Sequence, residues 1–125
     1  MNKNTIAAIY DALADCFNQR DLEGILDFYE PGAVFVPNSG ERVSGRDALG
    51  AVYQEYLNLG GEIAFEVQGA VQNGDIALTN NKHTIRGTDS DGNPFTIAGS
   101  AYEVLRRQPD GRWLFIIDEA KISAT

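Results

Sequence analysis

The sequence predicts an α+β domain in which helices pack on one face of a curved antiparallel sheet. Up to residue 59, most apolar residues recur at helical spacing. From residue 62 onward they alternate with polar residues, as in half-buried strands. Turn sequences such as Asn73-Gly74 separate these later stretches, which is the pattern of strands joined by hairpins. Helices that precede a run of strands are typical of α+β domains.

Length and composition agree with one globular domain. The chain has 125 residues, which is enough to build a hydrophobic core. It contains no repeat, linker or low-complexity segment. Hydrophobic residues make up 43% and charged residues 22%, as in ordinary globular domains. We therefore interpret residues 1–125 as a single domain.

Two helices are expected at the start of the chain. The first spans residues 5–18, with Asn4 as its possible N-cap. The second follows Asp21, which is the expected N-cap there, and Pro31-Gly32 ends it. The apolar positions that define the two helices are Ile6, Ile9, Tyr10, Leu13, Phe17, Leu22, Ile25, Leu26 and Tyr29.

A short strand and a third helix come next. Residues 33–36 have the pattern of a strand, which Pro37 and a polar turn bring to an end. Ser44 and Asp47 lie three residues apart, and this capping-box spacing predicts the start of the third helix. Gly60-Gly61 ends that helix. Its apolar stripe consists of Leu49, Val52, Tyr53 and Tyr56.

Four strands joined by hairpins complete the chain. In the first, residues 62–72, apolar side chains alternate with polar ones and should share one face. Residues 75–87 form the return strand after Asn73-Gly74. Further turns precede strands at residues 95–107 and 112–121. The alternating apolar residues of the first strand are Ile63, Phe65, Val67 and Val71.

The last two strands carry large apolar residues on both faces. An antiparallel sheet with one face in water normally shows one apolar and one polar face. The helices can cover only one face, so the other face needs a cover, and a second copy of the chain is the usual one. We therefore expect a homodimer packed through the outer face of the sheet, formed by Tyr102, Val104, Trp113, Phe115 and Ile117.

The charge balance argues against several classes of partner. Acidic residues outnumber basic ones 18 to 10, which gives a net charge of -8. Nucleic acids and anionic membranes both require a basic surface, so neither is expected as a partner. No apolar run has the length of a membrane span, and the N-terminus lacks the pattern of a cleavable signal. Cys16 is the only cysteine, which favours a reducing compartment and predicts a cytoplasmic location.

No motif for a metal or a cofactor stands out. No Cys/His cluster has the spacing of a zinc site, and no glycine-rich phosphate loop occurs. Residues 89–94 begin like a calcium loop. However, Pro94 and Ser100 occupy the positions where such a loop needs glycine and glutamate. We therefore expect neither a metal nor a cofactor.

Two stretches carry a resemblance to a known superfamily: FYEPGAVFVPNSGERVSGRDAL in the middle of the chain and RRQPDGRWLFIIDEA near its end. With the order of elements, they make the chain similar to the nuclear transport factor 2-like superfamily. Within it, the chain most resembles the SnoaL-like and ketosteroid-isomerase-like branch of small bacterial proteins. The resemblance covers essentially the whole chain. It implies a cone, in which a curved sheet wraps three N-terminal helices around a deep pocket.

The resemblance implies only part of the ketosteroid isomerase machinery. The catalytic base of that branch falls on Pro37 and its oxyanion tyrosine falls on Leu13, and neither residue can do that chemistry. The second oxyanion donor falls on Glu103, which could serve as a donor. Two supporting tyrosines match Tyr29 and Tyr53. Steroid isomerisation itself is therefore not expected.

The last hairpin decides whether Asp118 reaches the pocket. The turn at residues 108–111 predicts four opposed pairs: Arg107 with Arg112, Leu105 with Leu114, Glu103 with Ile116, and Ala101 with Asp118. Directly opposed residues point to the same face. An inward Glu103 therefore brings Ile116 and Asp118 inward as well.

The same parity on the preceding strand turns Asn81, His83 and Ile85 inward. The polar groups that should face the pocket are then Asn81, His83, Glu103 and Asp118. The residues expected to line it and contact a ligand are Leu13, Phe17, Tyr29, Phe35, Val52, Tyr53, Asn81, Ile85, Gly99, Ala101 and Ile116.

Two classes of function fit such a pocket. The first is a cofactor-independent acid/base catalyst of isomerase, dehydratase, cyclase or epoxide hydrolase type, acting on a small hydrophobic oxygenated molecule. Asp118 would be its base, Glu103 its acid or hydrogen-bond donor, and His83 a donor or an orienting group. The alternative is a non-catalytic module that binds such a molecule, or whose main role is dimerisation.

Overall fold

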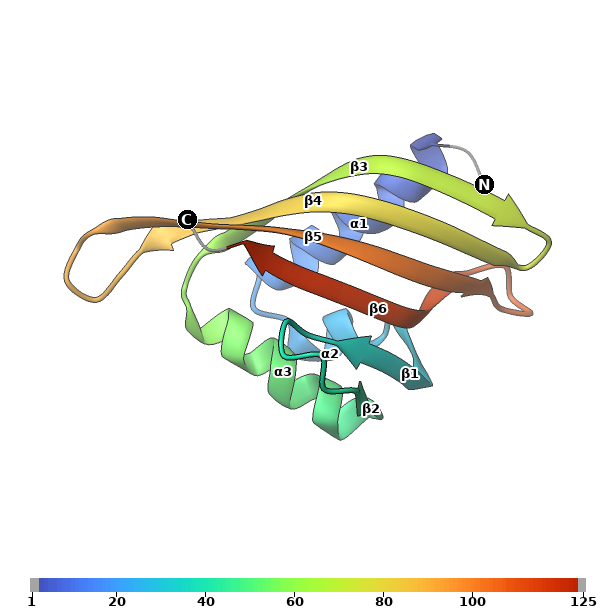
Figure 1. Cartoon of the computed structure of the whole chain (residues 1–125), viewed down its shortest axis with the longest axis horizontal. Helices are drawn as coiled ribbons and strands as arrows, with labels where there is room; N and C mark the ends of the chain where they lie inside the picture. The colour runs from blue at the N-terminus through green and yellow to red at the C-terminus, as the bar shows by residue number, and fades with distance from the viewer. Residues whose placement is uncertain (1–2, 124–125) are drawn as a thin grey trace.

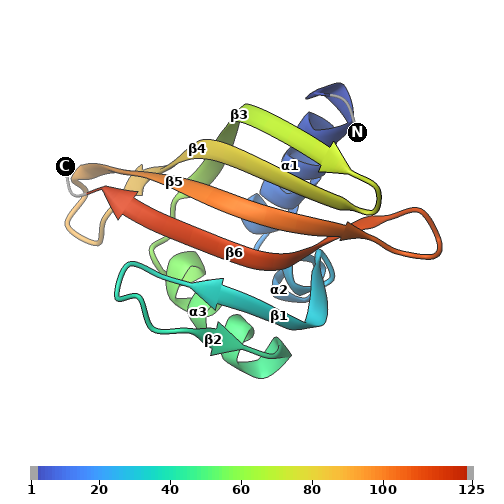
Figure 2. The ribbon, with the colours of Figure 1, turned by 45° about the vertical axis from the view of Figure 1, so that its right-hand side comes forward.

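The computed structural model describes residues 3–123, which form three helices and one six-stranded sheet. The helices are α1 (Lys3–Asn18), α2 (Leu22–Leu26) and α3 (Arg46–Asn58). The strands are β1 (Tyr29–Val36), β2 (Val43–Ser44), β3 (Glu62–Asn73), β4 (Ile76–Thr88), β5 (Pro94–Arg107) and β6 (Trp113–Ser123). In the sheet they follow the order β2-β1-β6-β5-β4-β3 (Figure 2). Every pair is antiparallel except β1 and β6, which run parallel.

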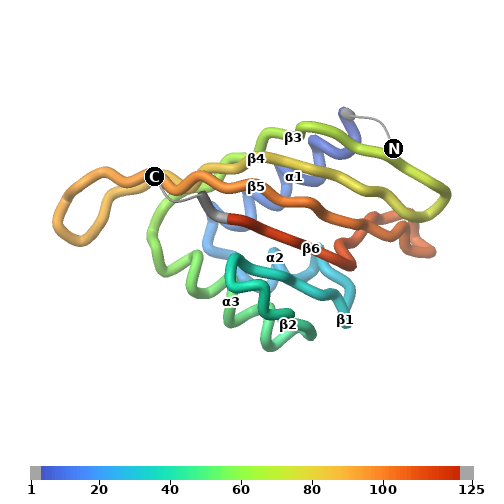
Figure 3. Tube along the Cα trace, viewed as in Figure 1, coloured from blue at the N-terminus to red at the C-terminus, as the bar shows by residue number. Residues whose placement is uncertain are grey.

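The sheet curves around the helices, and the hydrophobic core fills the space between the two layers. Helix α1 lies behind β3, β4 and β5, whereas α2 and α3 lie behind the other half of the sheet (Figure 1). The β4–β5 hairpin extends beyond the body of the molecule (Figure 3). These features confirm the predicted α+β cone. The largest fully buried side chains are Tyr10, Phe17, Phe35, Phe115, Ile6, Ile25, Leu49, Leu105 and Thr79.

The caps of the first two helices follow the prediction only in part. Helix α1 already begins at Lys3, so the prediction that Asn4 is its N-cap is wrong. Asp21 does cap α2, because its Oδ1 accepts a hydrogen bond of 3.0 Å from the backbone N–H of Gly24. Helix α2 ends at Leu26, well before the proline that was expected to end it.

Strand β1 begins earlier than predicted. Tyr29 is its first residue, and Pro31-Gly32 lies inside the strand instead of ending a helix. The pairing of β1 with β6 is interrupted between Tyr29 and Val34, and proline is tolerated at such an irregularity. The predicted capping box is also wrong, because Ser44 belongs to β2 and Gly45 is the N-cap of α3. Gly45 has φ +92, which a glycine adopts without strain.

Strand β3 contains a bulge that the sequence did not predict. Val67 pairs with Asn81 and Gly69 pairs with Asn80, so Gln68 is an extra residue. An extra residue moves all later side chains to the opposite face. Val71 is therefore 67% exposed, and the prediction that it shares a face with Ile63 is wrong.

A second bulge corrects the predicted pairing of the last hairpin. The observed pairs are Arg107 with Trp113, Leu105 with Phe115, Val104 with Ile117, Glu103 with Asp118, and Ala101 with Ala120. Ile116 is the extra residue, between Phe115 and Ile117. The predicted pairing was thus off by one residue at the turn and by two beyond the bulge. Even so, Asp118 keeps its inward direction, because it lies directly opposite Glu103.

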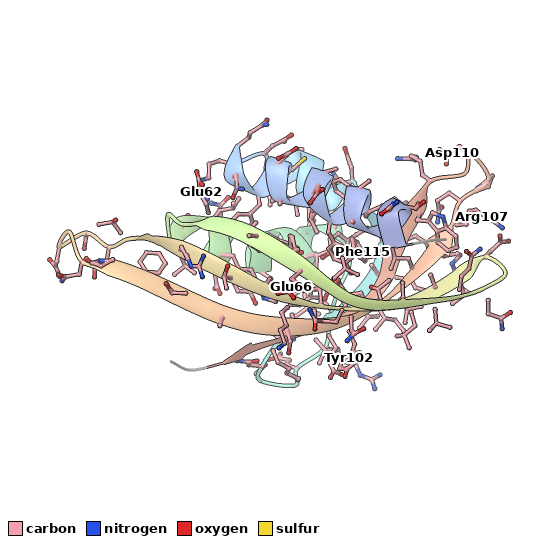
Figure 4. All side chains as sticks on the ribbon, turned by 90° about the horizontal axis from the view of Figure 1, so that it is seen from above. Glu62, Glu66, Tyr102, Arg107, Asp110 and Phe115 are labelled. Carbon is pink, nitrogen blue, oxygen red and sulfur yellow. The ribbon has the colours of Figure 1, made fainter. Side chains whose placement is uncertain are left out.

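Because of this register, several large side chains of β6 do not lie on the face of the sheet that was predicted for them. Phe115 was expected on the outer face, but it is completely buried in the core between the sheet and the helices (Figure 4). Trp113 was expected beside it and instead packs partly against the core, below the guanidinium of Arg107. Ile116 was expected to line the pocket, but as the bulge residue it does not. Of the predicted outer face, Tyr102 and Ile117 are exposed and Val104 is half-buried.

Candidate functional site

A cavity lies between the inner face of the sheet and helices α1 and α3. Its volume is small, about 40 Å³, which is room for a few water molecules. A larger ligand therefore requires side chains of the wall to move. The lining residues are Leu13, Phe17, Phe35, Tyr53, Tyr56, Ile63, Phe65, Asn81, His83, Ile85, Ile97, Ala101, Glu103, Asp118 and Ala120.

Most of this wall is hydrocarbon, and its ionisable groups are few. Among the residues that the structure describes, no lysine or arginine lines the cavity, so no side-chain cation from them compensates a negative charge inside it. The two carboxyl groups come from adjacent strands, since Glu103 of β5 pairs with Asp118 of β6. Glu103 is 4% exposed and Asp118 is 2% exposed. Burial of two acids this close together raises the cost of ionising both of them.

Glu103, on β5, is held by side chains from two other elements of the fold, α1 and β4. The hydroxyl of Tyr10, on α1, donates a hydrogen bond to its Oε1. Asn81 Nδ2, on β4, donates a second hydrogen bond of 3.0 Å to the same oxygen. Burial raises the pKa of Glu103 well above its usual value, and the nearby charge of Asp118 raises it further. The arrangement therefore favours a protonated Glu103, which can donate a hydrogen bond.

Asp118 is held on one oxygen only. Its Oδ2 accepts a hydrogen bond of 2.6 Å from the hydroxyl of Tyr29, which is itself hydrogen-bonded to the hydroxyl of Tyr53. Burial raises the pKa of Asp118, and the interactions of its carboxyl group with Glu103 and then with the hydroxyl of Tyr29 oppose that rise. Oδ1 is buried and has no hydrogen-bond partner among residues 3–123. An orphaned buried acceptor costs about 1–3 kcal/mol, so this oxygen gains from a proton or from a ligand that donates to it.

His83 lies on the same face of β4, two residues beyond Asn81. Its Nδ1 is 3.2 Å from Asn81 Oδ1, and its ring is 5.8 Å from the ring of Phe65. Burial lowers the pKa of His83, which favours the neutral imidazole at neutral pH. Gly99 is its partner on β5, and a Cβ atom there would come within 2.6 Å of His83 Nε2. The imidazole thus occupies the space that the missing side chain of Gly99 leaves.

The structure brings most of the predicted pocket residues together. Leu13, Phe17, Phe35, Tyr53, Asn81, Ile85 and Ala101 line the cavity with the three predicted catalytic residues. Tyr29 is behind the wall and reaches the site through Asp118. Val52 and Gly99 are not in the lining, although Val52 packs against the core and Gly99 packs against His83. Pro37, which the resemblance aligned with the base of the ketosteroid isomerases, is not in the lining either.

The most important residue that the sequence did not reveal is Tyr10. It is 1% exposed, and its hydroxyl contacts both Glu103 and Thr79 Oγ1, the latter at 2.7 Å. A tyrosine on a fully apolar helix stripe requires a partner for its hydroxyl, and this requirement was the available signal. The other lining residues that were not predicted are Tyr56, Ile63, Phe65, Ile97 and Ala120.

The described residues give no separate site for a metal. Across residues 3–123, no group of three or more histidine, cysteine, aspartate and glutamate side chains gathers closely enough to hold an ion. No helix in that part of the chain is long and apolar enough to cross a bilayer.

Comparison with known proteins identifies both a family and a fold. The model of the SnoaL-like domain family matches residues 10–116. No curated protein sequence matches the chain. Among solved structures, a ketosteroid isomerase-like protein from Erwinia carotovora atroseptica has 22% identity and a TM-score of 0.81, and each chain covers 100% of the other.

Two further structures share the fold. A candidate dehydratase of the nuclear transport factor 2-like family from Streptomyces avermitilis has 20% identity and a TM-score of 0.73, with 92% of this chain and 91% of that chain covered. The protein Aln2 from another Streptomyces strain has 16% identity and a TM-score of 0.79, with 93% of this chain and 86% of that chain covered. At these identities the likeness establishes the fold and leaves the chemistry to be argued from the site.

Proposed function

The chain belongs to the SnoaL-like domain family, and from that premise we propose that its cavity is the active site of a cofactor-independent acid/base catalyst. The substrate is a small, hydrophobic and oxygenated molecule, and the reaction is of isomerase, dehydratase, cyclase or epoxide hydrolase type. One observation carries the proposal. Two carboxyl groups, Glu103 and Asp118, face each other in an apolar cavity, and their surroundings divide the roles of acid and base between them.

Asp118 is the base in this proposal. Its Oδ1 has no partner among the described residues, so it can accept a proton from carbon, while Tyr29 holds Oδ2 and fixes the orientation of the carboxylate. The electron pair of the broken C–H bond moves toward an adjacent carbonyl oxygen of the substrate. Return of the proton from Asp118 to another carbon of the substrate completes an isomerisation. In a dehydration the electron pair returns from the oxygen, the bond to a β-hydroxyl group breaks, and this group leaves as water with the proton from Asp118.

Glu103 is the acid or hydrogen-bond donor. Its raised pKa keeps the proton on the carboxyl group, which can then stabilise the developing charge on the substrate oxygen. Tyr10 and Asn81 both donate to Oε1, which leaves the proton to Oε2. The apolar wall strengthens each of these interactions because it excludes water. Steroid isomerisation lies outside this proposal, because Pro37 and Leu13 occupy the positions of its base and oxyanion tyrosine.

Asp118→Asn tests the proposal. The purified chain is screened for turnover of small enones, epoxides and hydroxyacids, and the variant is then assayed on the substrate that is found. We expect turnover to fall by roughly 10²–10⁴-fold with the fold intact, as for the loss of a general base. Glu119→Gln is the matched control, since the neighbouring Glu119 is exposed. A variant that keeps full turnover would overturn the assignment of the base.

A ligand-binding module is the second candidate function. The loss of the family's base at Pro37 favours it, because binding needs no base. In this case Asp118→Asn changes the affinity for the ligand only modestly and no substrate of the wild-type chain is found.

The proposal also includes a homodimer formed through the outer face of the sheet. Leu78, Val104 and Ile117 lie side by side in one row across β4, β5 and β6, and Leu78 and Ile117 are 48% and 45% exposed. Tyr102, which is 60% exposed, points away from the helices, on the opposite side of the sheet from Phe115 (Figure 4). An apolar row of this kind is typical of a covered surface. The lone Cys16 supports a reducing compartment such as the cytoplasm.

A further inference from the structure

Three side chains at the floor of the cavity form a chain of hydrogen-bonding groups. Asn81 lies in the middle, between Glu103 on one side and His83 on the other. Its Nδ2 is 3.0 Å from Glu103 Oε1, and its Oδ1 is 3.2 Å from His83 Nδ1. Asn81 is 2% exposed, so its amide has little freedom to exchange these partners for water.

The two ends of the Asn81 amide have opposite hydrogen-bonding roles. The role of the end that contacts Glu103 therefore determines which nitrogen of His83 carries the hydrogen. Nδ2 can only donate, and it donates to Glu103 Oε1. Oδ1 can only accept, so the group that meets it must be a donor. His83 Nδ1 is that group and must carry a hydrogen. Because a neutral imidazole has one N–H, the other nitrogen, Nε2, is left with a free lone pair.

We propose that Asn81 fixes His83 in the Nδ1–H tautomer, so that Nε2 is a hydrogen-bond acceptor for a hydroxyl group of the ligand. The ring is half-buried, lines the cavity and lies beside Phe65. Nε2 lies against Gly99, and a Cβ there would come within 2.6 Å of this nitrogen, so only a residue without a side chain leaves room beside it. The lowered pKa of His83, caused by burial, agrees with a neutral ring.

This inference names a ligand class for the proposed active site and rests on that proposal. The cavity then offers two acceptors, His83 Nε2 and Asp118 Oδ1, and one donor, the carboxyl group of Glu103. No lysine or arginine of the described part of the chain lines it. The matching ligand is neutral and apolar and carries at least one hydroxyl group. A carboxylate or phosphate ligand meets an acidic cavity with no counter-charge and is rejected.

Nitrogen NMR of the histidine ring tests the tautomer directly. His83 is the only histidine of the chain, so a sample labelled with ¹⁵N in histidine gives the signals of one ring. At a pH where the ring is neutral, we expect Nδ1 to have the shift of a protonated nitrogen and Nε2 that of a bare one. The reverse pattern in the wild-type chain would overturn the inference, and no variant has to fold for this result.

Two variants test the role of Asn81. Asn81→Ala removes the acceptor for Nδ1–H of His83, and we expect the tautomer population of His83 to move to the Nε2–H form. Asn80→Ala is the matched control, because Asn80 precedes Asn81 on β4 and points to the other face of the sheet. We expect it to leave both signals in place. An unchanged tautomer in Asn81→Ala would show that another group sets it.

Phenol and anisole test the ligand class. The two probes have similar apolar bodies, but only phenol can donate a hydrogen bond. We expect phenol to shift the Nε2 signal and anisole to leave it unchanged. Equal shifts, or none with either probe, would overturn the ligand class. These measurements need no turnover. A wrong assignment of the His83 tautomer can therefore be distinguished from a wrong role for Asp118.

Discussion

Glu103 and Asp118 are directly paired across β5 and β6, and both side chains are almost completely buried. Three tyrosines tie this pair to the rest of the fold: Tyr10 donates to Glu103, Tyr29 donates to Asp118, and Tyr53 is hydrogen-bonded to Tyr29. The tyrosines come from α1, β1 and α3. The carboxyl pair is thus positioned by both layers of the domain, and changes in it should affect stability as well as function.

The first prediction concerns stability and pH. The pKa of Glu103 is raised in the folded state, so the folded chain binds a proton that the unfolded chain releases above about pH 4.5. The contribution of this proton to the free energy of unfolding is complete below that pH, and it is lost as the pH rises through the pKa that Glu103 has in the folded state. The slope is at most about 1.4 kcal/mol per pH unit for one group. Glu103→Gln should remove this loss of stability with rising pH. The free energy of unfolding of the variant, measured with a denaturant, should therefore depend less steeply on pH.

The control for this prediction is Glu119→Gln. Glu119 is exposed on β6, and this variant should keep the wild-type pH dependence. If Glu103→Gln and the wild type lose stability in parallel as the pH rises, Glu103 is ionised in the folded state and cannot be the acid.

A second prediction concerns the buried hydroxyl of Tyr10. Tyr10→Phe keeps the ring but removes the donor to Glu103 and the contact with Thr79. We expect the free energy of unfolding to fall by about 1–3 kcal/mol, because buried polar groups lose their partner. Chemical denaturation measures the change. Tyr102→Phe removes a hydroxyl group from the proposed dimer face but keeps the apolar ring, so it should have almost no effect, and an equal loss there would argue against the buried network.

A third prediction concerns the small residue behind His83. A Cβ at Gly99 would lie 2.6 Å from His83 Nε2 and 2.7 Å from the backbone oxygen of Lys121. Gly99→Ala should therefore displace the imidazole, shift its NMR signals and cost about 1–3 kcal/mol of stability, as overpacking does. Gly32→Ala is the control, because nothing lies within 4 Å of its Cβ position. An unshifted His83 signal in Gly99→Ala would contradict the observed packing.

A fourth prediction concerns the outer face of the sheet. Ile117→Arg places a charge in the apolar row of Leu78, Val104 and Ile117, and burying it in an interface is costly. We expect the dimer mass of the wild-type chain, measured by native mass spectrometry, to change to a monomer mass. Leu59→Arg, which alters a residue 40% exposed at the end of α3, should leave the dimer intact. A wild-type monomer would refute the proposed interface.

Local patterns in the sequence were sufficient to predict most elements of this fold, but not the boundary between α2 and β1 or the short strand β2. The apolar stripe of α1 and the alternation in β4 and β5 follow directly from the periods of helix and strand, and Asn73-Gly74 joins β3 to β4 as expected. Asp21 caps α2 because its side chain reaches a backbone N–H only three residues away. Such features depend on near neighbours in the chain, so the sequence alone could establish them.

The two bulges and the buried polar network could be identified only from the tertiary structure. A bulge adds one residue at Gln68 or Ile116 without a local signal, yet it moves Val71 to the outer face and brings Glu103 opposite Asp118. In the same way, nothing near Tyr10 in the sequence indicates that its hydroxyl meets a carboxyl group 93 residues away. The sequence by itself determined which residues are apolar, polar or ionisable on each element. Only the packed sheet and helices decided which of them share a buried space, because burial and register are properties of contacts between distant segments.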